Sequence, residues 1–283
     1  GLGDVYKRQM HHHAEGALKN KNEDMKRLYT IYFSATGTTQ QCVEKVCAGL
    51  GMKPVSELNL ADNLKADLPE FMADDVVVVA VPVYGGRVPA VVADALSHLK
   101  GNGATAIALV VYGNRDYDDA LLELTDVLTD RNFHVVGAGA FIGQHSIFPK
   151  VGASRPDLSD EQSLIKFGKE CVNAISEGHR PSGVPYIKGK KPYKQLAGIV
   201  LAPVAKEQDC VKCGACVRKC PVGAISIETP WITDTTKCIS CGRCITLCSQ
   251  NARKHSGLKY SIFGAIFKTC FSKRKEPEWT VVK

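Results

Sequence analysis

The sequence predicts a doubly wound α/β domain built on a parallel sheet of five strands, with a second, small α+β domain after it. Continuous apolar runs alternate strictly with segments of helical periodicity, which indicates the α/β domain. The loops that follow the apolar runs are rich in glycine, hydroxyl and tyrosine side chains, which places a site at the sheet edge. Eight of the twelve cysteines fall into two blocks of identical spacing, which indicates the small domain.

The strands are expected where the chain is apolar and rich in β-branched residues, as in "VVVVAVPVY". A continuous apolar run is typical of a parallel strand that is buried on both faces. The expected strands are residues 27–33, 53–60, 76–84, 104–113 and 133–142. Helical periodicity predicts helices at residues 38–50, 87–100, 116–131 and 159–178.

The loop after the first strand, "SATGTT", predicts a phosphate site. It places four hydroxyl side chains and a flexible glycine before a helix N-terminus, where the amides and the helix dipole favour an anion. An ordinary Ser/Thr helix cap explains one of these hydroxyls but not four. No lysine follows in the pattern of a triphosphatase loop, which favours a monophosphate. The predicted phosphate-binding residues are Ser34, Thr36, Gly37, Thr38 and Thr39.

The loops after the third and fourth strands, "PVYGGRVP" and "YGNRDYDD", carry aromatic rings beside glycines and polar residues. Taken singly, each tyrosine is explained as well by loop packing. Beside a phosphate site at the same sheet edge, these residues favour a planar cofactor with a phosphate tail. The predicted cofactor-binding residues here are Pro82, Val83, Tyr84, Gly85, Gly86, Tyr112, Gly113, Asn114, Asp116 and Tyr117.

Together these motifs resemble those of flavodoxins over about residues 26–178. The resemblance implies FMN as the cofactor and the strand order 2-1-3-4-5. It also implies that residues 34–39 hold the FMN phosphate, that Tyr84 and Tyr117 flank the isoalloxazine ring, and that the Gly85–Gly86 backbone lies near flavin N5. Arg87 stands where flavodoxins commonly carry an acidic residue or a tryptophan, and a cation there favours the anionic reduced flavin.

Both cysteine blocks, "CVKCGACVRKC" and "CISCGRCITLC", have the spacing C-x2-C-x2-C-x3-C. The first three cysteines of such a block wrap one face of an iron–sulfur cluster, and the fourth completes the other site. Glycines at 214 and 242 permit the tight backbone that this requires. The crossed scheme predicts two [4Fe-4S] clusters, one held by Cys210, Cys213, Cys216 and Cys248, the other by Cys238, Cys241, Cys244 and Cys220.

Two other uses of these cysteines explain the pattern less well. Zinc sites usually show separated C-x2-C pairs, and disulfides require an oxidising compartment. The segment resembles bacterial two-cluster ferredoxins over about residues 206–253, including "CPVGAI" after the first block. It departs from that family at Ser249, where proline is usual, and the serine hydroxyl and amide are expected near cluster sulfur.

The chain is expected to divide into a leader (1–24), an FMN domain (25–180), a linker (181–204), a cluster domain (205–254) and a tail (255–283). A short helix in the tail is expected to pack on the cluster domain. Residues 25–180 carry 14 Lys and Arg against 19 Asp and Glu, and residues 181–283 carry 18 against 6. Because eight thiolates offset the basic region, no nucleic-acid partner is expected. No apolar run reaches the length of a transmembrane segment and no export signal is found, so a cytoplasmic location is expected.

The whole chain resembles the flavodoxin–ferredoxin fusion proteins found mainly in anaerobic bacteria, including "GQHSIFPKVGASRPD" at residues 143–157. In that segment His145, Ser146 and Arg155 are candidates to line the flavin site or contact the iron–sulfur module, although a loop that closes the sheet explains them equally well. The predicted function is electron transfer between the two clusters and FMN, with redox proteins of unknown identity as partners.

Two alternatives to this function stay open at the level of sequence. One is a flavin-dependent reductase of a small molecule that is fed by the clusters, with His145, Tyr84 and Arg87 at its site. The other is a zinc-bearing interaction module on a flavodoxin-like scaffold. The sequence gives no prediction of the oligomeric state.

Overall fold

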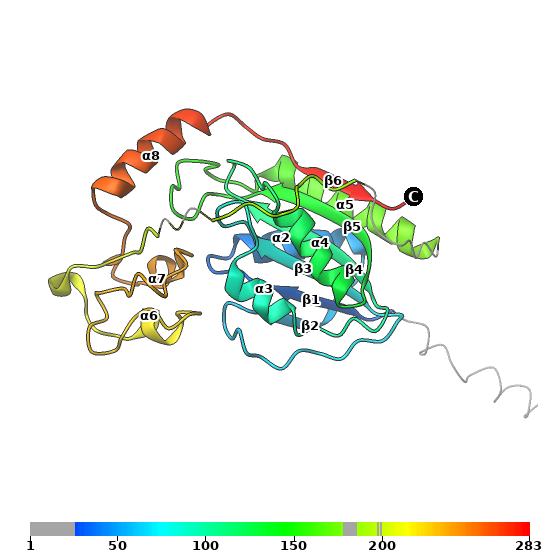
Figure 1. Cartoon of the computed structure of the whole chain (residues 1–283), viewed down its shortest axis with the longest axis horizontal. Helices are drawn as coiled ribbons and strands as arrows, with labels where there is room; N and C mark the ends of the chain where they lie inside the picture. The colour runs from blue at the N-terminus through cyan, green and yellow to red at the C-terminus, as the bar shows by residue number, and fades with distance from the viewer. Residues whose placement is uncertain (1–25, 178–185, 197, 199) are drawn as a thin grey trace, which may run out of the picture.

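The computed structural model describes residues 26–177, 186–196, 198 and 200–283 (Figure 1). The predicted leader and parts of the predicted linker (residues 181–185, 197 and 199) lie outside these described residues. Within the described part, the larger domain is a six-stranded sheet in the order β2-β1-β3-β4-β5-β6, with β1 to β5 parallel and β6 antiparallel to β5. The strands are β1 (Leu28–Tyr32), β2 (Pro54–Asn59), β3 (Val76–Pro82), β4 (Thr105–Tyr112), β5 (His134–Ile142) and β6 (Glu278–Val281).

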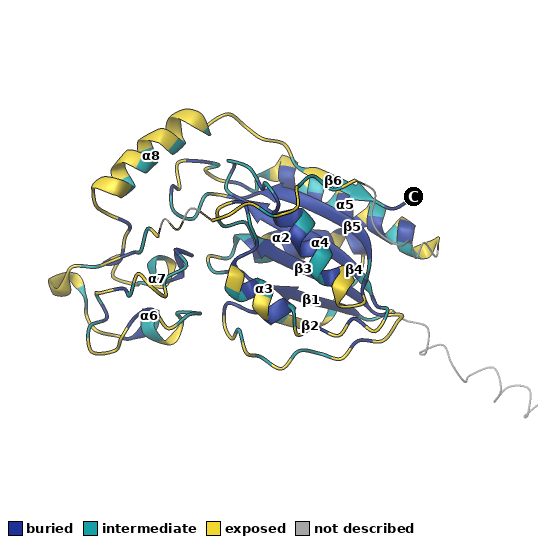
Figure 2. Cartoon of the chain, in the orientation of Figure 1, coloured by how far each residue is buried: buried dark blue, intermediate teal, exposed yellow. Residues whose placement is uncertain are grey.

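Helices cover both faces of the sheet, and this explains why the central strands are apolar throughout (Figure 2). On one face, α3 (Ala90–Leu96) and α4 (Ala120–Asp130) contribute Val92, Leu124 and Leu128 to one hydrophobic cluster. On the other face, α2 (Thr38–Leu50) and α5 (Leu158–Ser176) pack Val46 and Phe167 into a second cluster. The predicted doubly wound fold and the order 2-1-3-4-5 of its parallel strands are confirmed.

The sheet has one strand more than the five that the sequence predicts. The additional strand, β6, comes from the predicted tail and pairs antiparallel with the edge of β5. Its Trp279 ring stacks on Phe141 at 5.9 Å between centroids, and its indole N–H donates to the Glu170 carboxylate at 2.7 Å. Such a strand covers the open hydrogen-bonding edge of β5. Its run of four residues is too short to show a pattern of its own in the sequence.

The cysteine-rich segment contains little regular structure: the 3-10 turn η1 (Glu207–Asp209) and the short helices α6 (Ala215–Arg218) and α7 (Arg243–Thr246). A two-way backbone bridge between Val204 and Lys254 joins the two ends of this segment. Such a small segment has little apolar core, and bound clusters are a common way to stabilise one of this size.

After the cysteine-rich segment comes α8 (Leu258–Cys270), which lies apart from the sheet in Figure 1. The sequence places this helix on the cluster domain, but its Phe267 packs against Phe148 and His145 in the loop after β5, with ring centroids 4.7 Å and 5.1 Å apart. Its Tyr260 stacks on both Phe148 and His255. The helix therefore bridges the two parts of the molecule. Among the described residues, no helix combines the length and the apolar composition required to cross a bilayer.

The described part of the predicted linker, residues 186–196, is held against α4 and the loop before it. Lys188 pairs with Asp116, and Lys191 pairs with Asp126. Backbone amides of Lys190 and Lys194 donate to the Asp119 carboxylate. The basic residues of this segment therefore neutralise acidic residues of the α/β domain, which accounts for part of the charge asymmetry between the two halves of the chain.

Candidate functional site

The two cysteine blocks have the same local backbone. In each block, the residue before the second cysteine has positive φ (54° at Lys212 and 56° at Ser240). The glycine after that cysteine is also left-handed, with φ of 71° at Gly214 and 76° at Gly242, and serves as the N-cap of α6 or α7. The repeated spacing in the sequence therefore corresponds to a repeated loop that turns three cysteines toward one centre.

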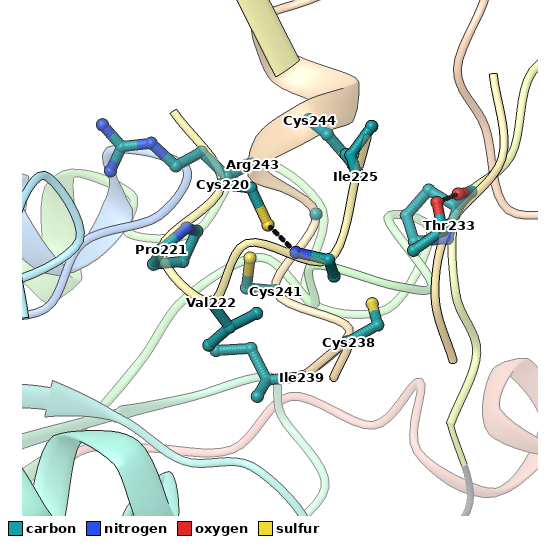
Figure 3. A pocket seen from close by; sticks show the side chains of 13 residues that line it. Cys220, Pro221, Val222, Ile225, Thr233, Cys238, Ile239, Cys241, Arg243 and Cys244 are labelled. Atoms are coloured by element: carbon teal, nitrogen blue, oxygen red, sulfur yellow. Dashed lines mark hydrogen bonds between the residues drawn. The ribbon is translucent and has the colours of Figure 1, made fainter. Parts of the chain in front are cut away.

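Two cavities in the described part of the chain are lined by cysteines, which are divided between them as the crossed scheme predicts. One cavity is lined by Cys220 of the first block with Cys238, Cys241 and Cys244 of the second (Figure 3). The other is lined by Cys210, Cys213 and Cys216 with Cys248 of the second block. We name the first the proximal cavity and the second the distal cavity. The first is the nearer to the sheet, because its Gly242 lies close to Thr36 in the loop after β1. Each fourth cysteine thus leaves its own block, which is the arrangement of a two-cluster ferredoxin.

Backbone amides donate hydrogen bonds to several of these sulfurs. The sulfurs are free thiols here and would be thiolates with a cluster bound. The amide of Ala224 donates to Cys220 Sγ at 3.3 Å, and the amide of Ser240 donates to Cys238 Sγ at 3.4 Å. At Cys248, burial raises the pKa, but amide donors from residues 250, 252 and 253 outweigh burial and lower it. The expected hydroxyl contact from Ser249 is absent: this side chain is exposed and accepts from the Gln250 side chain.

Each of the two cavities is lined by four cysteines, which is the number of ligands of a [4Fe-4S] cluster. Within residues 26–177, 186–196, 198 and 200–283, no three His, Cys, Asp or Glu side chains lie closely enough to form a site for a single ion.

The predicted phosphate loop lies at the carboxyl edge of the sheet, before α2. Gly37 is left-handed (φ 95°), and as the N-cap residue of α2 it provides no side chain to the amides of the first turn. A Cβ built on Gly37 meets no atom within 4 Å, so the space in front of this helix end is open. Ser34 is buried, and its hydroxyl accepts from the Gln40 amide. The phosphate site stays a prediction, and the open space beside Gly37 leaves room for an anion at this helix end.

The loop after β3 forms a tight hairpin turn. The Tyr84 and Arg87 backbones bond each other in both directions, with Gly85 and Gly86 at positive φ between them. Burial raises the pKa of Tyr84, and the Cys241 and Cys238 thiols add to the rise. Its side chain packs against the hydrophobic cluster that includes Cys241. The Arg87 guanidinium makes a bidentate pair with Glu123 instead of offering a free cation to a flavin. The expected effect of Arg87 on the reduced flavin is therefore not supported.

The remaining predicted cofactor residues mainly make contacts with other residues of the protein. Tyr112 and Tyr117 are buried against each other, and the Tyr117 hydroxyl donates to Glu278 of β6 at 2.8 Å. The Asn114 side chain binds three backbone groups in residues 271–275. The flavin contact proposed for Tyr117 stays a prediction, and its position in the structure is that of a core residue. The other members are placed as follows: Pro82 ends β3, Val83 donates its amide to Val111, Gly113 lies against His145, and Asp116 pairs with Lys188.

The proximal cavity lies directly against the loops at the sheet edge. Cys241 belongs to the same hydrophobic cluster as the β-strand core, and Ala35, Val83 and Tyr84 pack against that cluster. A Cβ built on Gly242 would lie 3.7 Å from Thr36 Cγ2 and 3.5 Å from the Ser146 carbonyl oxygen. The structure therefore brings Thr36, Tyr84 and Ser146 together with the second cysteine block. The contact of Ser146 with the iron–sulfur module is the expected one.

Asp62 also fixes this interface, although no motif in the sequence includes it. This residue, in the loop after β2, accepts from Lys219 of the first block at 2.8 Å and from Arg243 of the second at 2.6 Å. The Lys219 ammonium and the Arg243 guanidinium hold the pKa of Asp62 below its ordinary value. A single aspartate in a polar loop carries no signal in the sequence, because both of its partners are distant along the chain.

His145 is an internal part of the loop after β5. Its Nδ1 accepts from the amides of Ile147 and Phe148, and its ring packs between Phe148 and Phe267 of α8. Burial lowers the pKa of His145 to about 4, with smaller contributions from Arg115 and His255. Arg155 forms a buried ion pair with Asp160 at the start of α5. Both residues therefore close the sheet edge, as the structural alternative for this segment expected.

The half-buried His145 predicts a pH-dependent stability. Its folded pKa lies below the ordinary value of about 6.5, so the unfolded chain takes up the proton first. The stability that neutral His145 contributes is complete above pH 6.5 and is lost as the pH falls toward 4. Between pH 7 and pH 5 we expect the free energy of unfolding to fall by about 2 kcal/mol on this account. Urea unfolding followed by far-UV circular dichroism at both pH values measures this change.

The matched variant is His145→Asn, whose side-chain oxygen can replace Nδ1 as an acceptor but does not titrate. We expect this variant to lose less stability than the wild type over the same pH interval. An equal loss in both proteins would show that other groups, such as the buried His255, control the acid response.

Comparison with known proteins gives one family match and several similar solved structures. Residues 209–252 match the family model described as a 4Fe-4S dicluster domain. No curated protein matches the chain. Solved structures similar to it include a Streptococcus pneumonia TIGR4 flavodoxin (20% identity, 52% of this chain and 98% of that chain, TM-score 0.35) and oxidised flavodoxin 1 from Bacillus cereus (16% identity, 50% and 95%, TM-score 0.37). A third is rubredoxin oxygen:oxidoreductase from the anaerobe Desulfovibrio gigas (15% identity, 56% of this chain but 38% of that chain, TM-score 0.40).

The strand order assigns the fold of the α/β domain, and the cysteine geometry assigns the cysteine-rich segment. The parallel strands follow the order 2-1-3-4-5 that defines the flavodoxin-like sheet. The cysteine-rich segment has both the family match and the crossed cavities. The chain therefore combines a flavodoxin-like α/β domain with a ferredoxin-type 4Fe-4S dicluster segment.

Proposed function

We propose that this protein is an electron carrier that relays electrons between two [4Fe-4S] clusters and an FMN. The observation that carries the proposal is the contact of the proximal cavity, through Cys241 and Gly242, with Tyr84 and Thr36 at the predicted flavin edge of the sheet. When bound, iron–sulfur clusters exchange single electrons, and a flavin exchanges one or two.

The protein's own groups position such a relay. Crossed cysteines hold one cluster in each cavity, and the amides of Ala224 and Ser240 orient the sulfurs of the proximal one. The loop at 34–39 holds the phosphate of the FMN at the helix end. Cys213, in the distal cavity, is exposed to solvent, whereas Cys241, in the proximal cavity, is buried. We infer that external redox proteins exchange electrons at the distal cluster, and that the proximal cluster connects it to the flavin.

The three residues expected at the site of a small-molecule reductase do not favour that alternative. Arg87 is neutralised by Glu123, and His145 is packed between aromatic rings with its Nδ1 already bonded. Tyr84 packs against the hydrophobic cluster that includes Cys241. We further propose a cytoplasmic location, since free thiols are kept reduced there.

The decisive experiment uses the full chain purified without oxygen. We expect iron, acid-labile sulfide and FMN in the protein, and reduction of the clusters should be followed by reduction of the flavin within one molecule. Stopped-flow absorbance at several protein concentrations tests this point, because an internal step is independent of concentration. Efficient turnover with small organic acceptors, and none with acceptor proteins, would instead support a reductase.

The ion pairs at Asp62 give a sharper test of the internal contact. In Asp62→Lys, two attractions with Lys219 and Arg243 become repulsions. The pair with Lys219 is exposed, and such a pair is worth about 0.2–1 kcal/mol, whereas Arg243 is buried in the other pair. A combined loss of about 1–2 kcal/mol lowers the equilibrium constant for docking roughly five- to thirtyfold. The internal electron-transfer rate should fall with it, most strongly at low salt.

The control for this change is Asp67→Lys, which places the same charge on an exposed aspartate of the same loop. This variant should keep the wild-type rate. If both variants behave alike, the docking seen in the structure is not the arrangement that transfers electrons.

A further inference from the structure

One guanidinium lies in the wall between the two cysteine cavities. Arg253 is 3% exposed. Its Nη2 donates to the Pro203 carbonyl at 2.7 Å and to the Thr233 hydroxyl, and both of these residues line the proximal cavity. Its Nη1 donates to the carbonyl of Pro230, which lines the distal cavity together with Arg253 itself. The side chain is therefore anchored to the linings of both sites at once.

The charge of Arg253 has no carboxylate partner in the described part of the chain. All three hydrogen-bond acceptors are neutral oxygens, and its Nε is buried without a partner among the described residues. A buried cation that is left uncompensated is costly. The groups that remain to compensate it are the thiolates of the two cavities and the clusters they would hold, which carry net negative charge.

We propose that Arg253 is a shared tuning residue, whose buried positive charge raises the reduction potentials of both clusters and weakens the repulsion between them. Reduction adds one negative charge to a cluster, and a nearby buried cation stabilises that charge more than an exposed one does. This inference rests on the proposed function, because it requires both clusters to be present.

Arg218 on α6 provides a matched control. It is also an arginine beside the cysteines, and its Nη1 donates to the Cys213 carbonyl at 3.1 Å. It is exposed, and its hydrogen bond goes to Cys213, which lines the distal cavity. Solvent therefore screens its charge, and the proximal cluster should not sense it.

The test is a potentiometric titration of the full-length protein, prepared without oxygen and monitored by electron paramagnetic resonance and absorbance. We expect Arg253→Met to lower the potentials of both clusters, each by at least a tenfold change in the reduction equilibrium, which is about 59 mV for one electron. Arg253→Lys, which keeps the charge, should shift both by less. Arg218→Met should leave the proximal cluster unchanged.

Unchanged potentials in Arg253→Met, or a shift of one cluster only, would overturn the proposal. If the methionine variant loses its clusters while the lysine variant retains them, charge compensation is supported directly. Loss in both variants would contradict it, because shape rather than charge would then be decisive. A wild-type protein without clusters would refute the proposed function itself, and this outcome is distinct from all of the others.

Discussion

Replacing Cys213 and Cys248 together by alanine is expected to remove one cluster and leave the other intact. Both residues line the distal cavity although they belong to different blocks of the sequence. By contrast, the pair Cys213→Ala and Cys220→Ala takes one ligand from each cavity and should remove both clusters. Iron and acid-labile sulfide should therefore fall by about half in the first double variant and nearly to zero in the second.

The two double variants give opposite results under the two possible schemes of ligation. If each block held its own cluster, the Cys213 and Cys220 pair would spare one cluster and the Cys213 and Cys248 pair would spare none. Cys270→Ala is the control, since this thiol is exposed on α8 away from both cavities and its loss should not change the iron content. The first double variant should also keep electron transfer between the proximal cluster and the flavin.

Placing a carboxylate at Gly37 is expected to abolish tight binding of FMN. The space beside this left-handed residue is open and lies before the N-terminus of α2, so an aspartate there would compete with the phosphate and repel it. A hydrogen bond to a charged group is worth about 1.5–3 kcal/mol. We therefore expect the FMN dissociation constant of Gly37→Asp to rise at least tenfold and up to a hundredfold, as measured by fluorescence titration of apoprotein with FMN.

Two further variants separate charge from backbone strain. Gly37→Asn has nearly the same shape, tolerates positive φ and carries no charge, so it should bind FMN more tightly than the aspartate variant. Gly51→Asp places the same residue at the opposite end of the same helix, at another left-handed glycine with open space beside it. It should bind FMN like the wild type. Equal binding by all of the variants would show that the phosphate is held elsewhere.

The sequence was sufficient to predict the parallel sheet and the division of the cysteines, for physical reasons that differ. The strands are recognisable because burial on both faces requires continuous apolar runs, as in Val76–Pro82. The cysteines are predictable because two or three intervening residues limit which cluster each sulfur can reach. In both cases the information is local, so no knowledge of distant contacts is needed.

What the sequence could not show depends on pairs of residues that are far apart along the chain. Tyr117 looks the same in a loop whether it faces a flavin or a glutamate of β6. The ion pairs of Asp62 likewise join a loop after the second strand to the two cysteine blocks. The strand Glu278–Val281 is defined by its partner β5 rather than by its own pattern. In all three cases the role of the residue or strand is set by a contact with a distant part of the chain.

The position of β6 has a consequence for how the molecule is built and divided. After β5 and α5 the chain next adds a strand to the sheet at Glu278, beyond both cysteine blocks. The iron–sulfur segment is thus an insertion tethered at both ends, not an appendage at one. Two tethers keep the module at a high effective concentration near the flavin edge even when its docking contacts open. A chain cut off before β6 should leave the β5 edge bare, and we expect it to self-associate through that edge.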